Sequence, residues 1–381
     1  MTGPADRRPT VSPAPLPVAP LLPSGVDTPA LVIDLDIVER NARRLADALA
    51  ERAIALRPHA KTHKSVALGK LQLGAGAKGL TVGNIGEAEV FAAGGVDDLF
   101  IAYPVWAEGA KAARVRDLHE RPGLALRVGF DSIEGARRLA AAVSGSGRVL
   151  EIVLELDPGN RRTGAPPEGA GEIAAAAREL GLNVLGVFTH GGHAYRPGGA
   201  EPAGQDEVRA LATGADALRA EGIEPIVISA GSTPTQLTAA AGPVNEIRAG
   251  TYLLGDRQQW AIGAVPDDGI ALAVAATVVS AAVEGQVVID AGAKTLTKDV
   301  ATYLTGHGVI PPYPDAIIER VSDYHGVVTA PNGAPLPKLG EVVAVIPNHV
   351  CPVVDLRDTF IATRSGVVIG TWSVDARGRS G

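Results

Sequence analysis

Cysteine is almost absent from this chain. Cys351 is the only one among 381 residues, so an intramolecular disulfide is excluded. Aromatic residues make up only 4% of the sequence, and every apolar run is too short or too interrupted to span a membrane. The net charge is −7 and no basic patch is present, which argues against a nucleic-acid partner. The proline-rich start lacks the apolar core of a signal peptide. We therefore expect a cytoplasmic protein that binds neither nucleic acid nor membranes.

The rest of the composition is ordinary for a soluble α/β protein, with 46% hydrophobic residues, 20% charged residues and 46 glycines. A length of 381 residues suits either two domains or one large barrel with an addition. Residues 1–24 hold many prolines and no periodic apolar pattern. This segment is predicted to be a flexible N-terminal arm with polyproline character.

Strand-like runs alternate with helix-like stretches across residues 25–262. The first helix-like stretch follows "ALVID", with Asp36 as its expected N-cap. Later strand-like runs are "IALRPH", "GLTVGN", "LFIAYP", "LALRVGF", "EIVLELD", "VLGVFTH", "PIVISAG" and "EIRAGTY". About eight such units predict a closed (β/α)8 TIM-type barrel, whose usual size is ~250 residues. An open doubly wound sheet is the alternative, but no GxGxxG motif follows the first strand.

The pattern changes in residues 263–381. The runs "ALAVAATVVS", "GVVTAP", "EVVAVIP" and "GVVIGTW" are rich in β-branched residues and are separated by turn residues, with little helical periodicity. Such runs predict a separate, C-terminal all-β domain.

The stretch "LRPHAKTHKS" places four nitrogen bases just after an early barrel strand. Reactive groups of a (β/α)8 barrel lie at the carboxyl ends of its strands. A lysine there, Lys61, can form a Schiff base with an aldehyde if neighbouring cations or burial lower its pKa. His59 is expected to be a partner of Lys61, near the aldehyde cofactor that such a Schiff base would hold. The alternative is a basic, solvated loop, and we assign His63 and Lys64 to such a loop.

Three further strand ends carry polar clusters. They hold Asp157, Arg161 and Arg162; His190, His193 and Tyr195; and Gly231, Ser232 and Thr233. The last cluster is a glycine-flanked hydroxyl turn that can hold a phosphate, although most such turns are only turns. The run "RAGTYL" one strand later is where barrels often place a second phosphate-binding loop. A phosphate site together with a Schiff-base lysine suggests pyridoxal phosphate.

A second candidate site is "PNHVCPVVD" in the C-terminal domain. If this segment is extended, His349 and Cys351 point to the same side and can bind one metal ion. An imidazole with a thiolate favours Zn²⁺ over harder cations. The alternative is a core cysteine beside a histidine whose hydrogen bonds are satisfied.

With these motifs the sequence resembles the fold-type III pyridoxal-phosphate enzymes, and more narrowly the alanine-racemase-like branch of D-serine dehydratases and D-threonine aldolases. The resemblance is carried by "RPHAKTHK", "ELDPGNRRTG", "THGGHAY", "SAGSTPT", "EIRAGTY", "PNHVCP" and "VDARGR". It implies a head-to-tail homodimer in which Lys61 carries the cofactor, Arg162 lies near its ring and Tyr195 lines the site. The implied phosphate-binding residues are Gly231, Ser232, Thr233, Gly250 and Tyr252.

The resemblance also narrows the reaction. Aldolase-like members read His-Cys-Asp where this chain reads His349, Val350, Cys351. The thiolate favours a zinc-dependent dehydratase that converts a D-β-hydroxy-amino acid to a 2-oxo acid and ammonia. Two alternatives stay open: a D-threonine aldolase, with His193 as a candidate base, and a non-catalytic pyridoxal-phosphate carrier.

Two residues depart from the family pattern. Tyr324 replaces a usual Glu, and Asp355 replaces a usual Asn. Both lie in the domain expected to complete the site, so they bear on the substrate. Asp355 also offers a third metal ligand.

Overall fold

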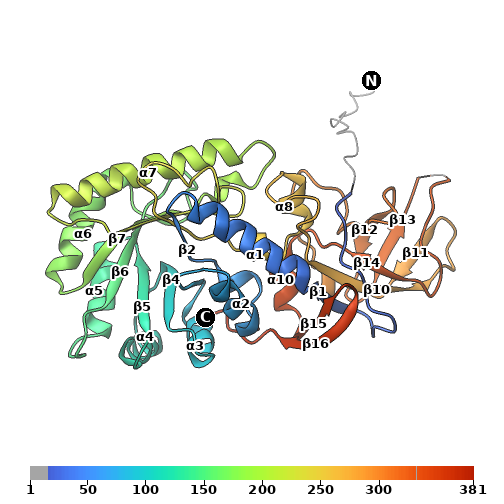
Figure 1. The fold of residues 1–381 in the computed structure, drawn as a ribbon, viewed down its shortest axis with the longest axis horizontal. Helices are drawn as coiled ribbons and strands as arrows, with labels where there is room; N and C mark the ends of the chain where they lie inside the picture. Colours follow the sequence, from blue (N-terminus) through green and yellow to red (C-terminus); the bar gives the residue numbers. More distant parts are fainter. Residues whose placement is uncertain (1–15, 332) are drawn as a thin grey trace, which may run out of the picture.

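The larger lobe is built on eight parallel strands in one curled sheet, as predicted (Figure 1). The computed structural model describes residues 16–331 and 333–381. The strands are β2 (Ala55–Leu56), β3 (Leu80–Val82), β4 (Asp98–Pro104), β5 (Ala125–Phe130), β6 (Glu151–Glu155), β7 (Asn183–Phe188), β8 (Val227–Ala230) and β9 (Glu246–Ile247). They pair in the order β2-β9-β8-β7-β6-β5-β4-β3. An isolated parallel bridge between His59 and Thr81 brings the two edges together and closes the barrel.

Helices alternate with these strands and cover the outside of the sheet. They are α1 (Leu35–Ala50), α2 (Val66–Gly74), α3 (Ile85–Ala93), α4 (Ala110–Glu120), α5 (Ile133–Ala142), α6 (Ala170–Glu179), α7 (Ala200–Ala220) and α8 (Arg257–Ala261). Helix α1 is capped by the Asp34 carboxylate, which accepts hydrogen bonds from the N–H groups of Asp36 and Ile37. The prediction of Asp36 as the cap is therefore wrong by two residues, because the strand before α1 ends at Asp34.

The second lobe is a mostly antiparallel β domain, which confirms the predicted fold class. Its strands are β1 (Ala30–Asp34), β10 (Leu272–Ser280), β11 (Gln286–Ile289), β12 (Ile317–Val321), β13 (Gly326–Thr329), β14 (Val342–Val345), β15 (Thr359–Arg364) and β16 (Val367–Ser373), with short helices α9 (Ala293–Leu296) and α10 (Val350–Asp355). Strand β1 pairs antiparallel with β10 and parallel with β15. The predicted barrel range 25–262 thus includes a strand of the second sheet.

The predicted N-terminal arm falls partly outside the described residues, since its residues 1–15 are not among them. Residues 16–24 contain a turn but no helix or strand. The Val18 N–H donates to the Asp267 carbonyl at 3.1 Å, and Leu16 and Ala19 pack against a buried apolar cluster around Val265. In the part of the chain that the structure describes, every helix is too short or too polar to cross a membrane.

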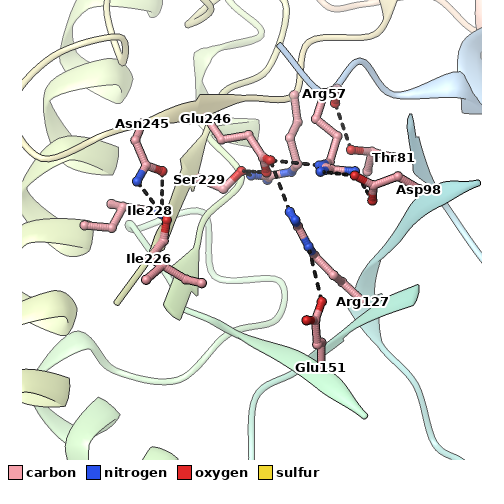
Figure 2. A network of polar contacts seen from close by, with 11 residues as sticks. Arg57, Thr81, Asp98, Arg127, Glu151, Ile226, Ile228, Ser229, Asn245 and Glu246 are labelled. Carbon is pink, nitrogen blue, oxygen red and sulfur yellow. Dashed lines mark hydrogen bonds and ion pairs between the residues drawn. The ribbon is translucent and has the colours of Figure 1, made fainter. Parts of the chain in front are cut away.

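A layer of charged side chains, with Arg57 and Glu246 buried at its centre, crosses the barrel below its mouth (Figure 2). Arg57 donates to Glu246 at 2.8 Å and to Asp98 at 2.7 Å, while Arg127 lies 3.4 Å from Glu246 and 3.8 Å from Glu151. Burial disfavours charge on Glu246, but Arg57 outweighs it and lowers the pKa of that carboxyl. These charges are therefore held in pairs, and they form a polar floor beneath the carboxyl ends of the strands.

Candidate active site

A recess that is partly open to solvent lies where the loops after β2, β6, β7, β8 and β9 converge. Eight of the nine predicted cofactor-binding residues line it: His59, Lys61, Arg162, Tyr195, Gly231, Ser232, Thr233 and Gly250. The loops are far apart in sequence, and the barrel topology alone brings them together.

Lys61 lies in a single 3₁₀ turn, Ala60–Thr62, that follows β2. The turn is capped by His59, whose Nδ1 accepts the Lys61 N–H at 3.3 Å. Desolvation by the surrounding protein lowers the pKa of the Lys61 ammonium. The negative charge of Cys351 raises this pKa, and the positive charges of Arg162 and Arg248 lower it, so that the net shift is downward. The lowered pKa favours the neutral, nucleophilic amine.

Two imidazoles beside Lys61 are uncharged at neutral pH. Burial, with the charges of Lys61 and Arg248, lowers the pKa of His59 well below 6.5. Burial and the charges of Lys61 and Arg162 do the same to the pKa of His190. Both rings line the recess, so they offer neutral hydrogen-bonding groups there rather than positive charge.

The loops after β8 and β9 depend on glycine for their conformation and for close packing against the rest of the barrel. Gly231 has φ +101°, which a side chain rarely adopts. A Cβ on Gly250 would lie 2.9 Å from the His59 carbonyl oxygen. The Gly231 N–H donates to buried Glu207 at 2.9 Å, and the Thr233 hydroxyl accepts the Tyr252 N–H at 3.1 Å. The two loops are thus tied together around the recess.

Arg248 lies at the inner end of the recess and was not among the predicted site residues. Its guanidinium donates to the Ser229 hydroxyl at 2.6 Å and to the Thr189 carbonyl, and it lies 5.1 Å from the centre of the Phe188 ring. Ser229 in turn donates to Glu246 at 2.7 Å, which connects the recess to the charged floor. A buried arginine directly after a barrel strand in "EIRAGTY" was the available signal. Thr62 and Thr251 also line the recess and were missed, whereas His190, which also lines it, was named in a strand-end cluster without a role.

The segment of the proposed metal pair is extended only in part, so alternation along a strand does not place the two side chains. His349 is extended, but Cys351 lies in the first turn of α10. Burial opposes charge on both groups, yet the attraction between the two opposite charges raises the pKa of His349 to about 10 and lowers the pKa of Cys351. The Cys351 Sγ lies 3.4 Å from the Thr62 hydroxyl, next to Lys61. The two predicted sites therefore meet at one place.

Two predicted residues lie differently from the rest. The Nε2 of His193 lies 3.1 Å from the Asp206 carboxylate, and its buried Nδ1 has no hydrogen-bond partner among the described residues. The Tyr252 hydroxyl accepts from the buried Gln72 side chain at 3.0 Å. The recess as described includes neither side chain.

The assignment of His63 and Lys64 to a solvated loop is wrong, because both are buried. His63 is hydrogen-bonded to Gln72 at 3.0 Å. The Lys64 ammonium lies 2.6 Å from Asp355, one of the two departures from the family pattern. Asp355 is thus engaged by Lys64. The other departure, Tyr324, is exposed and contacts Lys294 at 3.1 Å.

Comparison with known proteins matches residues 33–258, more than half of the chain, to the family "Alanine racemase, N-terminal domain". The chain belongs to the alanine racemase-like, fold-type III pyridoxal-phosphate family. Residues 271–363 match a second family, "Putative serine dehydratase domain". The two matches fall on the barrel and on the β domain.

Similar proteins include both lyase types. D-threo-3-hydroxyaspartate dehydratase of Delftia sp. (strain HT23) is 32% identical, over 91% of this chain and 97% of its own. D-threonine aldolase of Arthrobacter sp is 33% identical, over 93% of this chain and 94% of its own. The crystal structure of D-threonine aldolase from Filomicrobium marinum has a TM-score of 0.85 and 31% identity, over 95% and 99%. A cysteine-to-alanine mutant of a D-threo-3-hydroxyaspartate dehydratase, solved in the metal-free form, has a TM-score of 0.83 and 30% identity, over 92% of this chain and 97% of its own.

The recess fits pyridoxal phosphate. A lysine with a lowered pKa offers the amine, and Gly231, Ser232, Thr233 and Gly250 line the same recess with backbone and hydroxyl groups suited to a phosphate. The neighbouring pair fits one soft divalent cation, because His349 offers an imidazole and Cys351 a sulfur two residues further along the chain. Among residues 16–331 and 333–381 no three or more His, Cys, Asp or Glu side chains converge on a metal position. The protein would therefore leave coordination positions open.

Proposed function

We propose that this protein is a pyridoxal-phosphate- and zinc-dependent lyase that converts a D-β-hydroxy-amino acid to a 2-oxo acid and ammonia. The observation that carries the proposal is the contact between the Cys351 thiol and Thr62, the residue after Lys61. It puts a metal-binding pair beside the amine that would hold the cofactor. A carrier of pyridoxal phosphate has no use for such a pair.

When bound, pyridoxal phosphate would stabilise negative charge at the substrate Cα, and the metal ion would act as a Lewis acid toward the β-hydroxyl. Lys61 would accept the Cα proton at its Nζ, since its lowered pKa leaves part of the amine neutral. His59 and His190 would orient bound groups through hydrogen bonds without adding positive charge. Arg162 at the exposed rim and Arg248 at the inner end would attract the phosphate and carboxylate groups.

The cysteine supports the dehydratase. A carboxylate takes its place in the aldolase-like motif, and a cysteine-to-alanine mutant of a similar D-threo-3-hydroxyaspartate dehydratase was solved in the metal-free form. Retro-aldol cleavage to glycine and an aldehyde is the second candidate, because two D-threonine aldolases are as similar to this chain. The candidate base for that reaction is His193, because Asp206 engages its Nε2 and its Nδ1 has no hydrogen-bond partner among the described residues.

The test is a product assay on the purified holoenzyme with D-serine, D-threonine and D-threo-3-hydroxyaspartate. The protein is assayed with each substrate as purified, after chelation of its metal and after Zn²⁺ is restored. Formation of 2-oxo acid and ammonia is compared with formation of glycine and aldehyde. We expect zinc-dependent 2-oxo acid. Glycine and aldehyde would replace the dehydratase by the aldolase, and cofactor binding without turnover or zinc uptake would favour the carrier.

We also propose the head-to-tail homodimer that the resemblance implies, and a cytoplasmic location. Sedimentation of the holoenzyme tests the first. A mass near twice 38.9 kDa is expected for a dimer, and a single-chain mass would contradict it.

A further inference from the structure

One carboxylate contacts the proposed metal pair from outside the recess. The Asp299 Oδ2 lies 2.5 Å from the Nδ1 of His349. With Nδ1 engaged, Nε2 is the ring nitrogen left for Cys351 and for a metal ion. The ring orientation is therefore set by a residue fifty positions away in sequence.

Asp299 is itself held in place. The buried Asn348 side chain donates to the Asp299 carbonyl at 3.1 Å and to the Gly306 carbonyl at 2.8 Å. Its amide oxygen accepts from Arg257 at 3.1 Å. Asn348 thus fixes the backbone of Asp299, and the Asp299 side chain in turn holds the His349 ring.

The main chain around His349 is fixed from the barrel side. The Asp256 carboxylate accepts the Val350 N–H at 3.0 Å, and the Arg257 and Gln258 N–H groups donate to the carbonyls of Pro347 and Asn348 at 3.0 Å each. The backbone on both sides of His349 therefore has its own supports. These leave rotation of the ring to be set by Asp299 and Cys351.

We propose that Asp299 is a positioning residue for the metal site, which holds the His349 ring with Nε2 toward the metal and strengthens it as a donor. This inference rests on the proposed function, in which His349 and Cys351 bind a divalent cation. A carboxylate on the far nitrogen of a metal-binding histidine fixes the ring and raises its basicity.

A plain surface ion pair is the competing explanation. The Asp299 and His349 side chains are 45% and 34% exposed, and an ion pair of that exposure contributes little to stability. The buried Asn348 anchor would be superfluous for such a pair. An Asp299 variant should accordingly change metal binding much more than folding.

The experiment compares Zn²⁺ affinity in the full-length protein by competition with a chelating dye. The variants are Asp299→Ala, Asp299→Asn and His349→Ala, with Asp315→Asn as a control that removes an exposed carboxylate of the same domain. We expect Asp299→Ala to bind Zn²⁺ about 10–100-fold more weakly. Asp299→Asn should lose less, since the amide oxygen still accepts the Nδ1 hydrogen, and Asp315→Asn should match the wild type.

Co²⁺ provides a readout that a structural defect would not reproduce. The Co²⁺-loaded Asp299→Ala variant should keep the thiolate-to-metal absorption of Cys351 but show shifted ligand-field bands. Its far-ultraviolet circular dichroism should match that of the wild type, which shows that the fold is unchanged. Normal Zn²⁺ affinity in Asp299→Ala, together with weak binding in His349→Ala, would overturn the inference alone. A wild-type protein that binds no Zn²⁺ would overturn the zinc part of the proposed function, and the inference with it.

Discussion

The floor and the mouth of the barrel differ in whether their charged side chains have close partners. In the floor layer, Arg57 and Glu246 are almost fully buried and ion-paired within 2.8 Å. At the mouth, Lys61 and Arg162 face the recess beside two uncharged imidazoles, and the ion contact of Arg162 is a longer one, 3.6 Å from Glu155. Paired charges in the floor are satisfied by the fold. Cations at the mouth are left for anionic ligands.

A single segment crosses from one level to the other. Arg57 belongs to the floor, Lys61 to the mouth, and His63 with Lys64 to the packing behind the mouth. Neighbouring basic residues therefore have different tasks, which depend on the partners that the barrel brings to each. This comparison can be tested by removing one group at a time.

The largest effect is expected at the mouth. Lys61→Ala should lower kcat by at least about 10³-fold, because the group proposed to carry the cofactor and the Cα proton is gone. Borohydride reduction followed by denaturation and mass spectrometry checks the covalent link. Lys111→Ala, an exposed lysine on α4, is the control. Cofactor still attached covalently in Lys61→Ala would show that another lysine holds it.

In the floor, removal of one anion should cost stability. Glu246→Ala leaves buried Arg57 with Asp98 alone, and loss of a partner from a buried pair costs about 3–5 kcal/mol. The free energy of unfolding is measured in urea. Glu151→Gln removes a carboxylate that is 38% exposed and should cost under about 1 kcal/mol. Equal losses in the two variants would mean that burial does not distinguish these pairs.

Behind the mouth, His63 should make the fold sensitive to acid. Burial lowers the pKa of His63 to about 4, whereas an unfolded histidine titrates near 6.5. Below about pH 6.5 the unfolded chain therefore binds a proton that the native state does not, and stability falls as the pH decreases toward 4. The loss should approach about 3 kcal/mol.

The measurement for His63 is the free energy of unfolding between pH 7 and 4.5. His63→Gln should show a shallower fall than the wild type, even if it is less stable at pH 7. His325→Gln, which changes an exposed histidine, is the control. Parallel curves for His63→Gln and the wild type would argue that His63 is protonated in the native state.

The alternation of strands and helices was sufficient to predict the barrel, because hydrophobic periodicity survives in a single sequence. The positions at strand ends likewise predicted most of the recess. What failed depended on partners far away in sequence. His63 and Lys64 are predicted to lie in a basic loop because the sequence does not show their contacts. In the structure both are buried, His63 against Gln72 and Lys64 against Asp355. Strand β1 reads as a barrel strand, since nothing local records its pairing with β10.

The smallest effect tests whether the packing behind the mouth resembles the floor. Asp355→Asn keeps an oxygen for the Gly378 N–H but removes the charge 2.6 Å from buried Lys64, which would retain Glu87 at 3.7 Å. Asp355 is about one-third exposed, so the loss should be about 1–2 kcal/mol, less than for Glu246→Ala. Asp358→Asn, at a far more exposed pair with Arg377, should lose almost nothing. A loss as large as that of Glu246→Ala would mean that Lys64 and Asp355 are a second floor-like pair, holding α10 and its cysteine against the Lys61 turn.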